Sequence, residues 1–383
     1  MENSVARNTT SVSGDRSIKN WANEPSLTEV LLLAVMSYLI YLAIKVSFNG
    51  YWPVVTTFGD NGTYMKYAAA IRHWDFASVQ DGIKEFWGFP YAIVALSLVM
   101  HSSFWTALLI ICGVASLGTV ALSYRLWGGW VAAIFAVLSR EWVERSLLGG
   151  SEPLFLVLAF GALLAARRQR WLLAALLASL STVVRPIGIF ALMGIGLVLL
   201  LRRQFRTLTW AILIGLVIGT LYTVPFKIYL GNPLANVKGY NEVDWYGGRL
   251  LTFPFFAIVH DALHGNRTSL NLVRSILWIV IVLAGIAAMF VNQQFRDYAR
   301  KYAVESSFCF LNMAFLLTYN SHWARAEFPR FTLPFLPFVL LAFLPWIPKD
   351  RRLLWVFAVL SVALSALETV GFMVGLEKIL RAL

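Results

Sequence analysis

The sequence has few charged residues. Asp, Glu, Lys and Arg make up 14% of its 383 residues, whereas hydrophobic residues make up 59%. The mean hydropathy is +0.68. A water-soluble globule of this composition would have too little polar surface to cover its core, so soluble enzymes and soluble binding domains are excluded. We therefore expect a chain whose first partner is the lipid bilayer.

Three further features are missing. The apolar runs lack the alternation of apolar and polar residues that marks a membrane β-barrel. The polar stretch 1–29 lacks the basic start and small-residue cleavage site of a signal peptide. Cys112 and Cys309 both lie in apolar runs, so we expect no disulfide framework. These absences predict an all-α polytopic membrane protein with a cytoplasmic tail at 1–29 and a single transmembrane domain at 30–383.

Basic residues raise the formal net charge to +12. They gather in short turns between apolar runs, so we expect topology signals and no nucleic-acid partner. If these turns are cytoplasmic, the loops 49–103, 231–269 and 320–330 are exoplasmic. Tyr91–Met100 is too short to cross and is expected to be an interfacial helix, which leaves about eleven spans. The basic turns are Arg167–Arg170, Arg202–Arg206, Arg296–Lys301 and Pro348–Arg352.

The first exoplasmic loop contains "TTFGDNGTYMKYAAAIRHWDF", Thr56–Phe76. Tyr64, Tyr67 and Ile71 recur in it at helical spacing, which predicts an amphipathic helix that lies on the membrane. Asp60 then falls near the N-cap of this helix, where a carboxylate stays ionised near neutral pH. Asp60 is therefore either an ordinary helix cap or a catalytic base.

Three more short motifs follow along the chain. They are "GGSEPLF" with Glu152, "VVRPIG" with Arg185, and "EFPRFTLPFLPF" with Glu327 and Arg330. Together with the Asp60 loop, this order of elements resembles the GT-C type membrane glycosyltransferases that use polyprenyl-phosphate sugars. The similar branch contains protein O-mannosyltransferases, bacterial aminoarabinose transferases and GPI mannosyltransferases. The resemblance implies exoplasmic transfer of a sugar, mannose being one candidate, from a polyprenyl-phosphate donor to an acceptor hydroxyl.

The resemblance also implies roles for individual residues. Asp60 matches the family's general base, and Tyr64 and Ala68 match the helix that follows it. Glu152 matches a second catalytic acidic residue, although a carboxylate that starts a helix is an equal alternative. Arg185 matches a basic residue near the lipid phosphate.

Other basic residues are alternative phosphate ligands. Lys66, Arg72 and Arg330 could each bind the donor phosphate, although such side chains more commonly extend toward lipid headgroups. In "REWVER", a polar flank into which a short span can extend, Glu141 and Arg145 lie one helical turn apart and are expected to pair.

A further set of residues is expected to contact the sugar or the acceptor. The aromatic residues could instead belong to the interfacial aromatic belt, and the histidines could simply be exposed on the surface. The set comprises Tyr64, His73, Trp245, Tyr246, His322 and Glu327.

The sequence departs from the family at the residue after Asp60. Many members have two acids there, "DE" or "DxD", whereas this chain has Asn61. One carboxylate remains where others have two, so a divalent metal is left open but is not indicated. His260 and His264 have a one-turn spacing suited to zinc but lack a clear third ligand, and no metal site is predicted.

Other classes of protein remain open. A polysaccharide polymerase or ligase would share the topology, and a lipid or solute transporter or a scaffold are the non-enzymatic alternatives. Transporters place charges at the membrane midplane, whereas the charges here lie at span ends, which favours the enzyme. The acceptor, which is a glycan, a lipid or a protein, stays open. The expected location is the bacterial inner membrane with the site facing outward.

Overall fold

The computed structural model describes residues 24–49, 51–79, 85–236, 251–264, 269–320 and 327–369. Within these ranges the regular structure is helical, apart from one isolated antiparallel bridge between Leu251 and Tyr319. The all-α class predicted from the apolar runs is confirmed. The predicted loop residues Trp245, Tyr246 and His322 lie outside the described ranges.

The helices follow the apolar runs closely. The first half of the chain forms α1 (Leu27–Asn49), α2 (Tyr51–Thr57), α3 (Asn61–His73), η2 (Phe76–Val79), α4 (Gly88–Met100), α5 (Phe104–Trp127), α6 (Gly129–Leu138), α7 (Arg140–Leu148), α8 (Glu152–Arg167) and α9 (Trp171–Val184). The second half forms η3 (Pro186–Gly188), α10 (Ile189–Leu201), α11 (Phe205–Leu230), α13 (Phe256–His264), α14 (Ser269–Val291), α15 (Gln293–Lys301), α16 (Ala303–Thr318), α18 (Phe328–Thr332), α19 (Leu336–Phe343), η5 (Leu344–Trp346) and α20 (Arg351–Thr369).

Three described helices are long and apolar enough to cross a membrane by themselves: α1, α5 and α11. Two bent pairs, α7 with α8 and α14 with α15, raise this number to five if each pair is one span. The remaining apolar helices have 10–17 residues. The count of about eleven spans therefore stays a prediction. "REWVER" forms a separate helix, α7, which Ser139 caps and whose axis is bent by 106° from that of α8.

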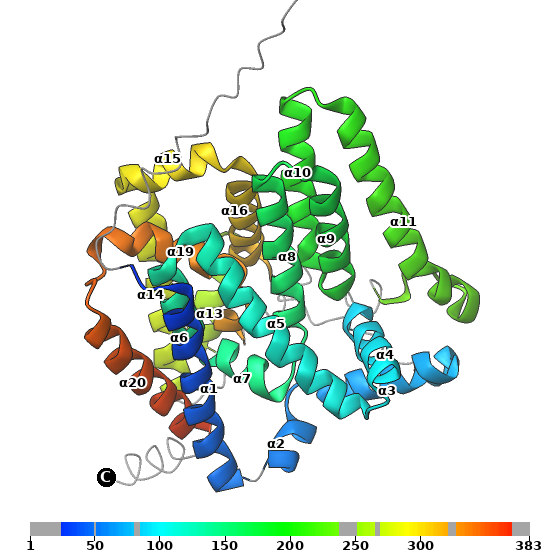
Figure 1. The fold of residues 1–383 in the computed structure, drawn as a ribbon, viewed down its shortest axis with the longest axis horizontal. Coiled ribbons are helices and arrows are strands. Elements are labelled where there is room, and N and C mark those ends of the chain that lie inside the picture. The colour runs from blue at the N-terminus through cyan, green and yellow to red at the C-terminus, as the bar shows by residue number, and fades with distance from the viewer. Residues whose placement is uncertain are drawn as a thin grey trace, which may run out of the picture.

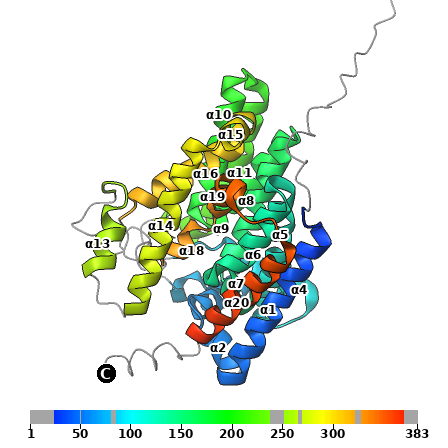
Figure 2. The ribbon, with the colours of Figure 1, turned by 90° about the vertical axis from the view of Figure 1, so that its left-hand side faces the viewer.

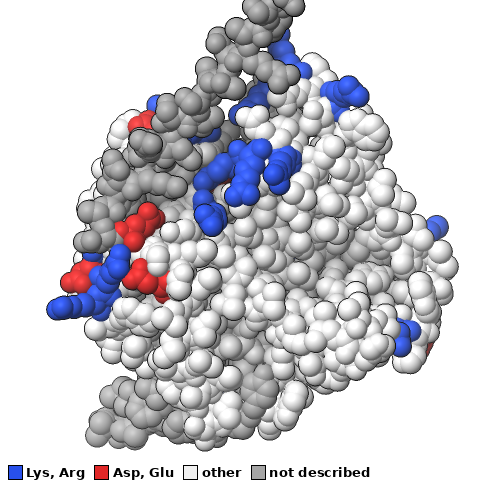
Figure 3. All heavy atoms as spheres, in the orientation of Figure 1, with Lys and Arg blue, Asp and Glu red and all other residues white. Residues whose placement is uncertain are grey.

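The two ends of the helix bundle differ in charge. The α10–α11 turn and α15 lie at the upper end in Figures 1 and 2, whereas α2, α3 and α7 lie toward the lower end. Figure 3 shows that Lys and Arg gather on the upper part of this face, while the lower part is mostly uncharged. The basic turns Arg167–Arg170 and Arg202–Arg206 thus share one end of the bundle, opposite the end that carries α3.

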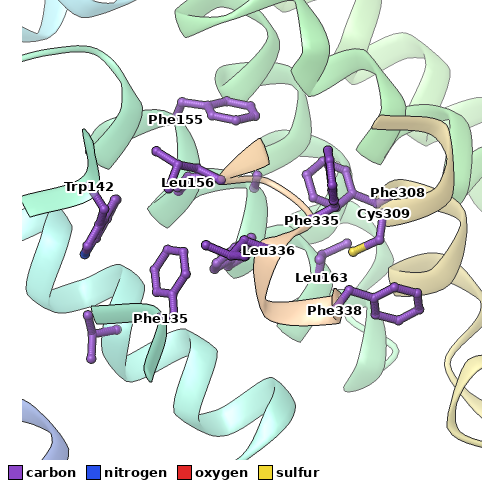
Figure 4. Close-up of a cluster of buried hydrophobic side chains, with 14 of the residues drawn as sticks. Phe135, Trp142, Phe155, Leu156, Leu163, Phe308, Cys309, Phe335, Leu336 and Phe338 are labelled. Atoms are coloured by element: carbon purple, nitrogen blue, oxygen red, sulfur yellow. The ribbon is translucent and has the colours of Figure 1, made fainter. Parts of the chain in front are cut away.

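The core is built around α8, which packs against both α5 and α9. Fully buried alanines, such as Ala159 and Ala162 on α8 and Ala175 on α9, let these helices approach closely. Figure 4 shows aromatic and aliphatic side chains of α6, α7, α8, α16 and the α18–α19 segment meeting in one cluster. Phe155 and Leu156 belong to this cluster and also line the pocket described below, so the packed core supports one wall of the site.

Candidate active site

Charged side chains from separate parts of the chain meet near the start of α8, at the end of the bundle opposite the basic turns. They come from the first loop, the α7–α8 corner, the α9–η3 hinge and α18. We call this set the Arg330 cluster; its members are Asp60, Arg145, Glu152, Arg185, Glu327 and Arg330.

Arg330 is the centre of the cluster and its side chain is only 9% exposed. Its Nε donates a close hydrogen bond to Glu152, and its Nη1 donates one to Glu327. Its Nη2 reaches Oδ2 of Asp60 at 3.4 Å. One planar guanidinium therefore contacts carboxylates from three segments, which fixes the relative positions of those segments.

Glu152, the first residue of α8, is buried between two arginines. Its Oε1 accepts hydrogen bonds from Arg330 and, at 2.5 Å, from Nη1 of Arg185. Its Oε2 is buried and has no hydrogen-bond partner among the described residues. Ser151 connects the first loop to this group, since its Oγ accepts from Arg185 at 3.1 Å and from the Tyr64 hydroxyl at 3.2 Å.

Arg145 is a member of the cluster that the sequence did not predict. Its guanidinium lies over the ring of Phe58 at 4.6 Å, and its Nη2 is 3.8 Å from Oε2 of Glu327. Nη1 is buried without a hydrogen-bond partner among the described residues. A Cβ at Gly59 would lie 2.6 Å from this Nη1, so the glycine leaves the room that the guanidinium occupies.

Arg145 was expected to pair with Glu141 across one helical turn. The structure instead pairs Arg140 with Glu144 at 3.2 Å and turns Arg145 toward the cluster. The sequence held one signal that Arg145 lies at a close-packed corner. This signal is the glycine pair that follows it in "ERSLLGG", because adjacent glycines often mark backbone that passes close to other atoms.

Charges within the cluster offset the effect of burial on the pKa of its ionisable groups. Burial alone would raise the pKa of Glu327, but the positive charges of Arg330 and Arg145 lower it below its ordinary value. Burial would lower the pKa of Arg330, and the carboxylates of Glu152, Glu327 and Asp60 raise it. Burial raises the pKa of Tyr64, which stays a neutral hydroxyl. Glu327 and Arg330 therefore form an ion pair throughout the physiological pH range.

A small pocket opens beside the cluster. One wall carries Glu152, Arg185 and Arg330, and the ring of Phe331 lies against both arginines, at 5.5 Å from Arg185 and 5.8 Å from Arg330. The rest of the pocket wall is apolar. It is formed by Phe155, Leu156, Ile187, Leu333 and Pro334. A ligand with an anionic head and an apolar chain matches these two walls.

Not every predicted site residue lies in this cluster. Asp60, Glu152, Arg185, Arg330 and Glu327 meet there, and Tyr64 joins them through Ser151. Lys66, Arg72 and His73 lie exposed on α3 and form no ion pair with the cluster within the described residues. The described part of the chain contains no group of three or more His, Cys, Asp and Glu side chains that could hold a metal ion.

Comparisons with known proteins give structural relatives only. No protein-family model matches the sequence. No curated protein matches it either.

Several solved structures resemble the chain, including two of ArnT and one of an oligosaccharyltransferase. ArnT from Cupriavidus metallidurans bound to undecaprenyl phosphate is 14% identical with a TM-score of 0.51, and the match covers 83% of this chain and 60% of that one. The apo ArnT structure is 17% identical with a TM-score of 0.49, covering 82% and 58%. The Archaeoglobus fulgidus oligosaccharyltransferase, in complex with Zn and sulfate, is 14% identical with a TM-score of 0.33, covering 91% and 51%.

The likeness to undecaprenyl-phosphate-bound ArnT is the one that carries weight, and at this identity it concerns the fold. The match covers about three-fifths of the ArnT chain. The order of the sequence motifs predicts the same fold independently. The chain therefore has a fold of the GT-C type, similar to that of ArnT.

Proposed function

We propose that this chain is a multi-pass membrane glycosyltransferase that moves a sugar from a polyprenyl-phosphate donor to an acceptor hydroxyl. The observation that carries this proposal is the position of Asp60. Its carboxylate is 37% exposed and lies beside a buried arginine–carboxylate cluster, next to a pocket with one charged and one apolar wall. A base, a place for phosphate and a surface for an isoprenoid chain are thus adjacent.

The chemistry follows from these groups. The Asp60 carboxylate takes the proton of the acceptor hydroxyl, whose oxygen forms a bond to the anomeric carbon of the sugar. The bond from that carbon to the phosphate oxygen breaks, and its electron pair stays on the phosphate, which leaves as polyprenyl phosphate. Arginines at the charged wall stabilise the charge that develops on the leaving oxygen.

The assignment of phosphate to Arg185 and Arg330 rests on geometry. Both guanidiniums line the charged wall of the pocket and present planar donors suited to an oxyanion. The apolar wall then faces the first isoprene units. The structure of ArnT with undecaprenyl phosphate supports a ligand of this class for this fold. Glu152 positions the two arginines, and Arg145 offers a further donor through its unpaired Nη1.

The finer assignments are part of the same proposal. Mannose is the first sugar to test, and the acceptor is a glycan, lipid or protein hydroxyl. The cluster lies at the end of the bundle opposite the basic turns, which supports an outward-facing site in a bacterial inner membrane. A polymerase or ligase would use the same chemistry with a glycan acceptor. A transporter is disfavoured, because the Arg330 cluster and the basic turns lie at the two ends of the bundle and not at its middle.

The test is a transfer assay in proteoliposomes. Purified protein is supplied with radiolabelled polyprenyl-phosphate mannose and, in parallel, with other polyprenyl-phosphate sugars, and a panel of lipid, glycan and peptide acceptors is followed. We expect label to move to one class of acceptor and Asp60→Asn to lose roughly 10²–10⁴-fold in rate, the usual contribution of a general base.

Asp75→Asn is the matched control, because Asp75 is an exposed aspartate just after α3 that accepts from the backbone of Ser78 at 3.3 Å. This variant should keep the wild-type rate. Full activity in Asp60→Asn would remove Asp60 from its role as the base. Absence of transfer from every donor, together with movement of a lipid or solute across the bilayer, would favour the transporter.

A further inference from the structure

Asn61, the residue that follows Asp60, is fully buried at 0% exposure. Its Nδ2 donates one hydrogen bond to the carbonyl of Val55, at 2.9 Å, and one to the carbonyl of Leu148, at 2.7 Å. Val55 belongs to α2 and Leu148 ends α7. The amide of Asn61 therefore ties the first loop to the α7–α8 corner.

That corner holds part of the Arg330 cluster. Gly149 and Gly150 form it with φ values of +120° and +144°. A Cβ at Gly149 would lie 2.5 Å from Oδ1 of Asn61, so the amide packs directly on this glycine. A Cβ at Gly150 would lie 2.5 Å from Cδ of Arg145 and 2.7 Å from Oε2 of Glu152. The corner that Asn61 fixes thus sets the distance between Arg145 and Glu152.

The chemistry at this position requires two N–H donors. Both carbonyls that face Asn61 are hydrogen-bond acceptors, and an amide supplies two donors from one nitrogen. An ionised aspartate in its place would set a buried negative charge against two carbonyl oxygens, which is strongly unfavourable. Asn61 therefore does not take the place of an acidic residue that binds a ligand. Both N–H donors of its amide are already bonded to carbonyls within the protein.

We infer that Asn61 is a positioning residue, which holds Asp60 in register with the α7–α8 corner so that Arg145, Glu152 and Arg330 face the Asp60 carboxylate. The effect of Asn61 on the transfer rate rests on the proposed function, whereas its effect on the structure of the α7–α8 corner does not. The adjacent Asp60 is then held from both sides, by Asn61 along the chain and by Arg330 across the site. Restoring a second acid at this position should damage the site.

The rate test uses Asn61→Ala and Asn61→Asp, with transfer from polyprenyl-phosphate sugar measured with and without Mn²⁺. We expect each variant to lose about tenfold to a hundredfold in kcat with little change in KM, the size of effect that a small misplacement of a catalytic group produces. The loss from Asn61→Ala should largely vanish in an Asp60→Asn background. Equal losses in both backgrounds, or Mn²⁺-stimulated activity in Asn61→Asp, would overturn the inference.

Asn312→Ala is the matched control. Asn312 is likewise buried, at 3% exposure, and its Nδ2 donates to the carbonyl of Phe308 at 2.8 Å on α16. It should lower the thermal midpoint without lowering kcat. A loss of kcat equal to that of Asn61→Ala would mean that any buried asparagine has this effect, and would contradict a specific role.

A second measurement is independent of catalysis. The thermal midpoints of Asn61→Ala, Gly149→Ala and the double variant form a cycle. Because a Cβ at residue 149 meets the Asn61 amide, the double variant should be less destabilised than the two single losses added together. Strict additivity would show that the amide does not pack on the corner. The thermal cycle therefore tests the contact of Asn61 with the corner even if no transfer is detected.

Discussion

Within the part of the chain that the structure describes, two arginine–carboxylate clusters lie at opposite ends of the bundle, and they are built differently. Arg167, at the end of α8, donates from Nε and Nη2 to the two oxygens of Glu305, each at 2.7 Å. It also donates to the carbonyls of Arg125 and Leu126, and its guanidinium lies 4.0 Å from the centre of the Tyr302 ring. Every nitrogen of this guanidinium is bonded within the protein, as in Arg330, but here both oxygens of the buried carboxylate partner are bonded too.

The Arg330 cluster leaves capacity unused. Nη1 of Arg145 and Oε2 of Glu152 are buried without hydrogen-bond partners among the described residues, and the carboxylates of Asp60 and Glu327 are each 37% exposed. The same residue types thus serve two purposes. A closed cluster joins helices, whereas an open one, with spare donors and acceptors beside a pocket, can accept a ligand.

The largest effect on stability should come from the closed cluster. Arg167→Ala leaves the buried carboxylate of Glu305 without its arginine, and we expect a loss of about 3–5 kcal/mol. Denaturation of the detergent-solubilised protein measures this loss. Arg168→Ala, in the same turn but exposed, is the control and should be near neutral. Unchanged stability in Arg167→Ala would contradict the role of this cluster as a junction between helices.

Arg330→Ala should lower both the stability of the protein and the rate of transfer, with a smaller loss of stability than Arg167→Ala. Glu152 keeps its bond to Arg185, so we expect about 1–3 kcal/mol of destabilisation. Transfer should fall roughly 10²–10³-fold, because a donor aimed at the developing charge is lost. The transfer assay and a melting curve measure the two effects separately. Arg330→Lys, which keeps the charge but not the planar donors, should recover stability more than rate; a fully active Arg330→Ala would exclude Arg330 from the site.

Glu327→Gln should produce a smaller effect that depends on pH. Since the pKa of Glu327 is lowered in the folded protein, its contribution to stability is present above the ordinary value of 4.5 and is lost as pH falls through the lowered pKa. Partial exposure keeps this contribution small. Melting midpoints of wild type and Glu327→Gln should therefore converge as the medium becomes acidic. Midpoints that diverge on acidification would reverse the sign of this prediction.

The smallest effects should come from Lys66→Ala and Arg72→Ala. Both side chains are exposed on α3, so each change should shift stability by no more than about 0.5 kcal/mol. Transfer should stay close to the wild-type rate if the donor phosphate binds at Arg185 and Arg330. A large rise in KM for the donor in either variant would move the phosphate toward α3.

Much of the fold could be predicted from the sequence because apolar runs end at basic turns, glycines and prolines. The helix expected from the spacing of Tyr64, Tyr67 and Ile71 matches α3, and the short helix expected at Tyr91–Met100 lies within α4. The separate helix α7 was not predicted, because its polar residues suggested an extension of a neighbouring span. Burial of Glu141, Glu144 and Arg145 within the protein overrides that pattern.

The site could be predicted only in part. Short motifs identified Asp60, Glu152, Arg185 and Arg330 as candidates, and the structure brings them together. The contact of Glu152 with Arg330 joins positions far apart in the chain, which no local periodicity encodes. Arg145 was missed for a related reason, since helical spacing offered Glu141 as a nearer partner.

The central claim is that the open cluster is the catalytic site and the closed one is a structural junction. It is tested most directly by measuring kcat/KM for transfer from a polyprenyl-phosphate sugar in Asp60→Asn and Arg167→Lys, each corrected for the folded fraction. We expect a loss of roughly 10²–10⁴-fold in Asp60→Asn with an unchanged melting midpoint. Arg167→Lys should melt lower and keep its rate. Full activity in Asp60→Asn, or loss of rate in folded Arg167→Lys, would contradict it.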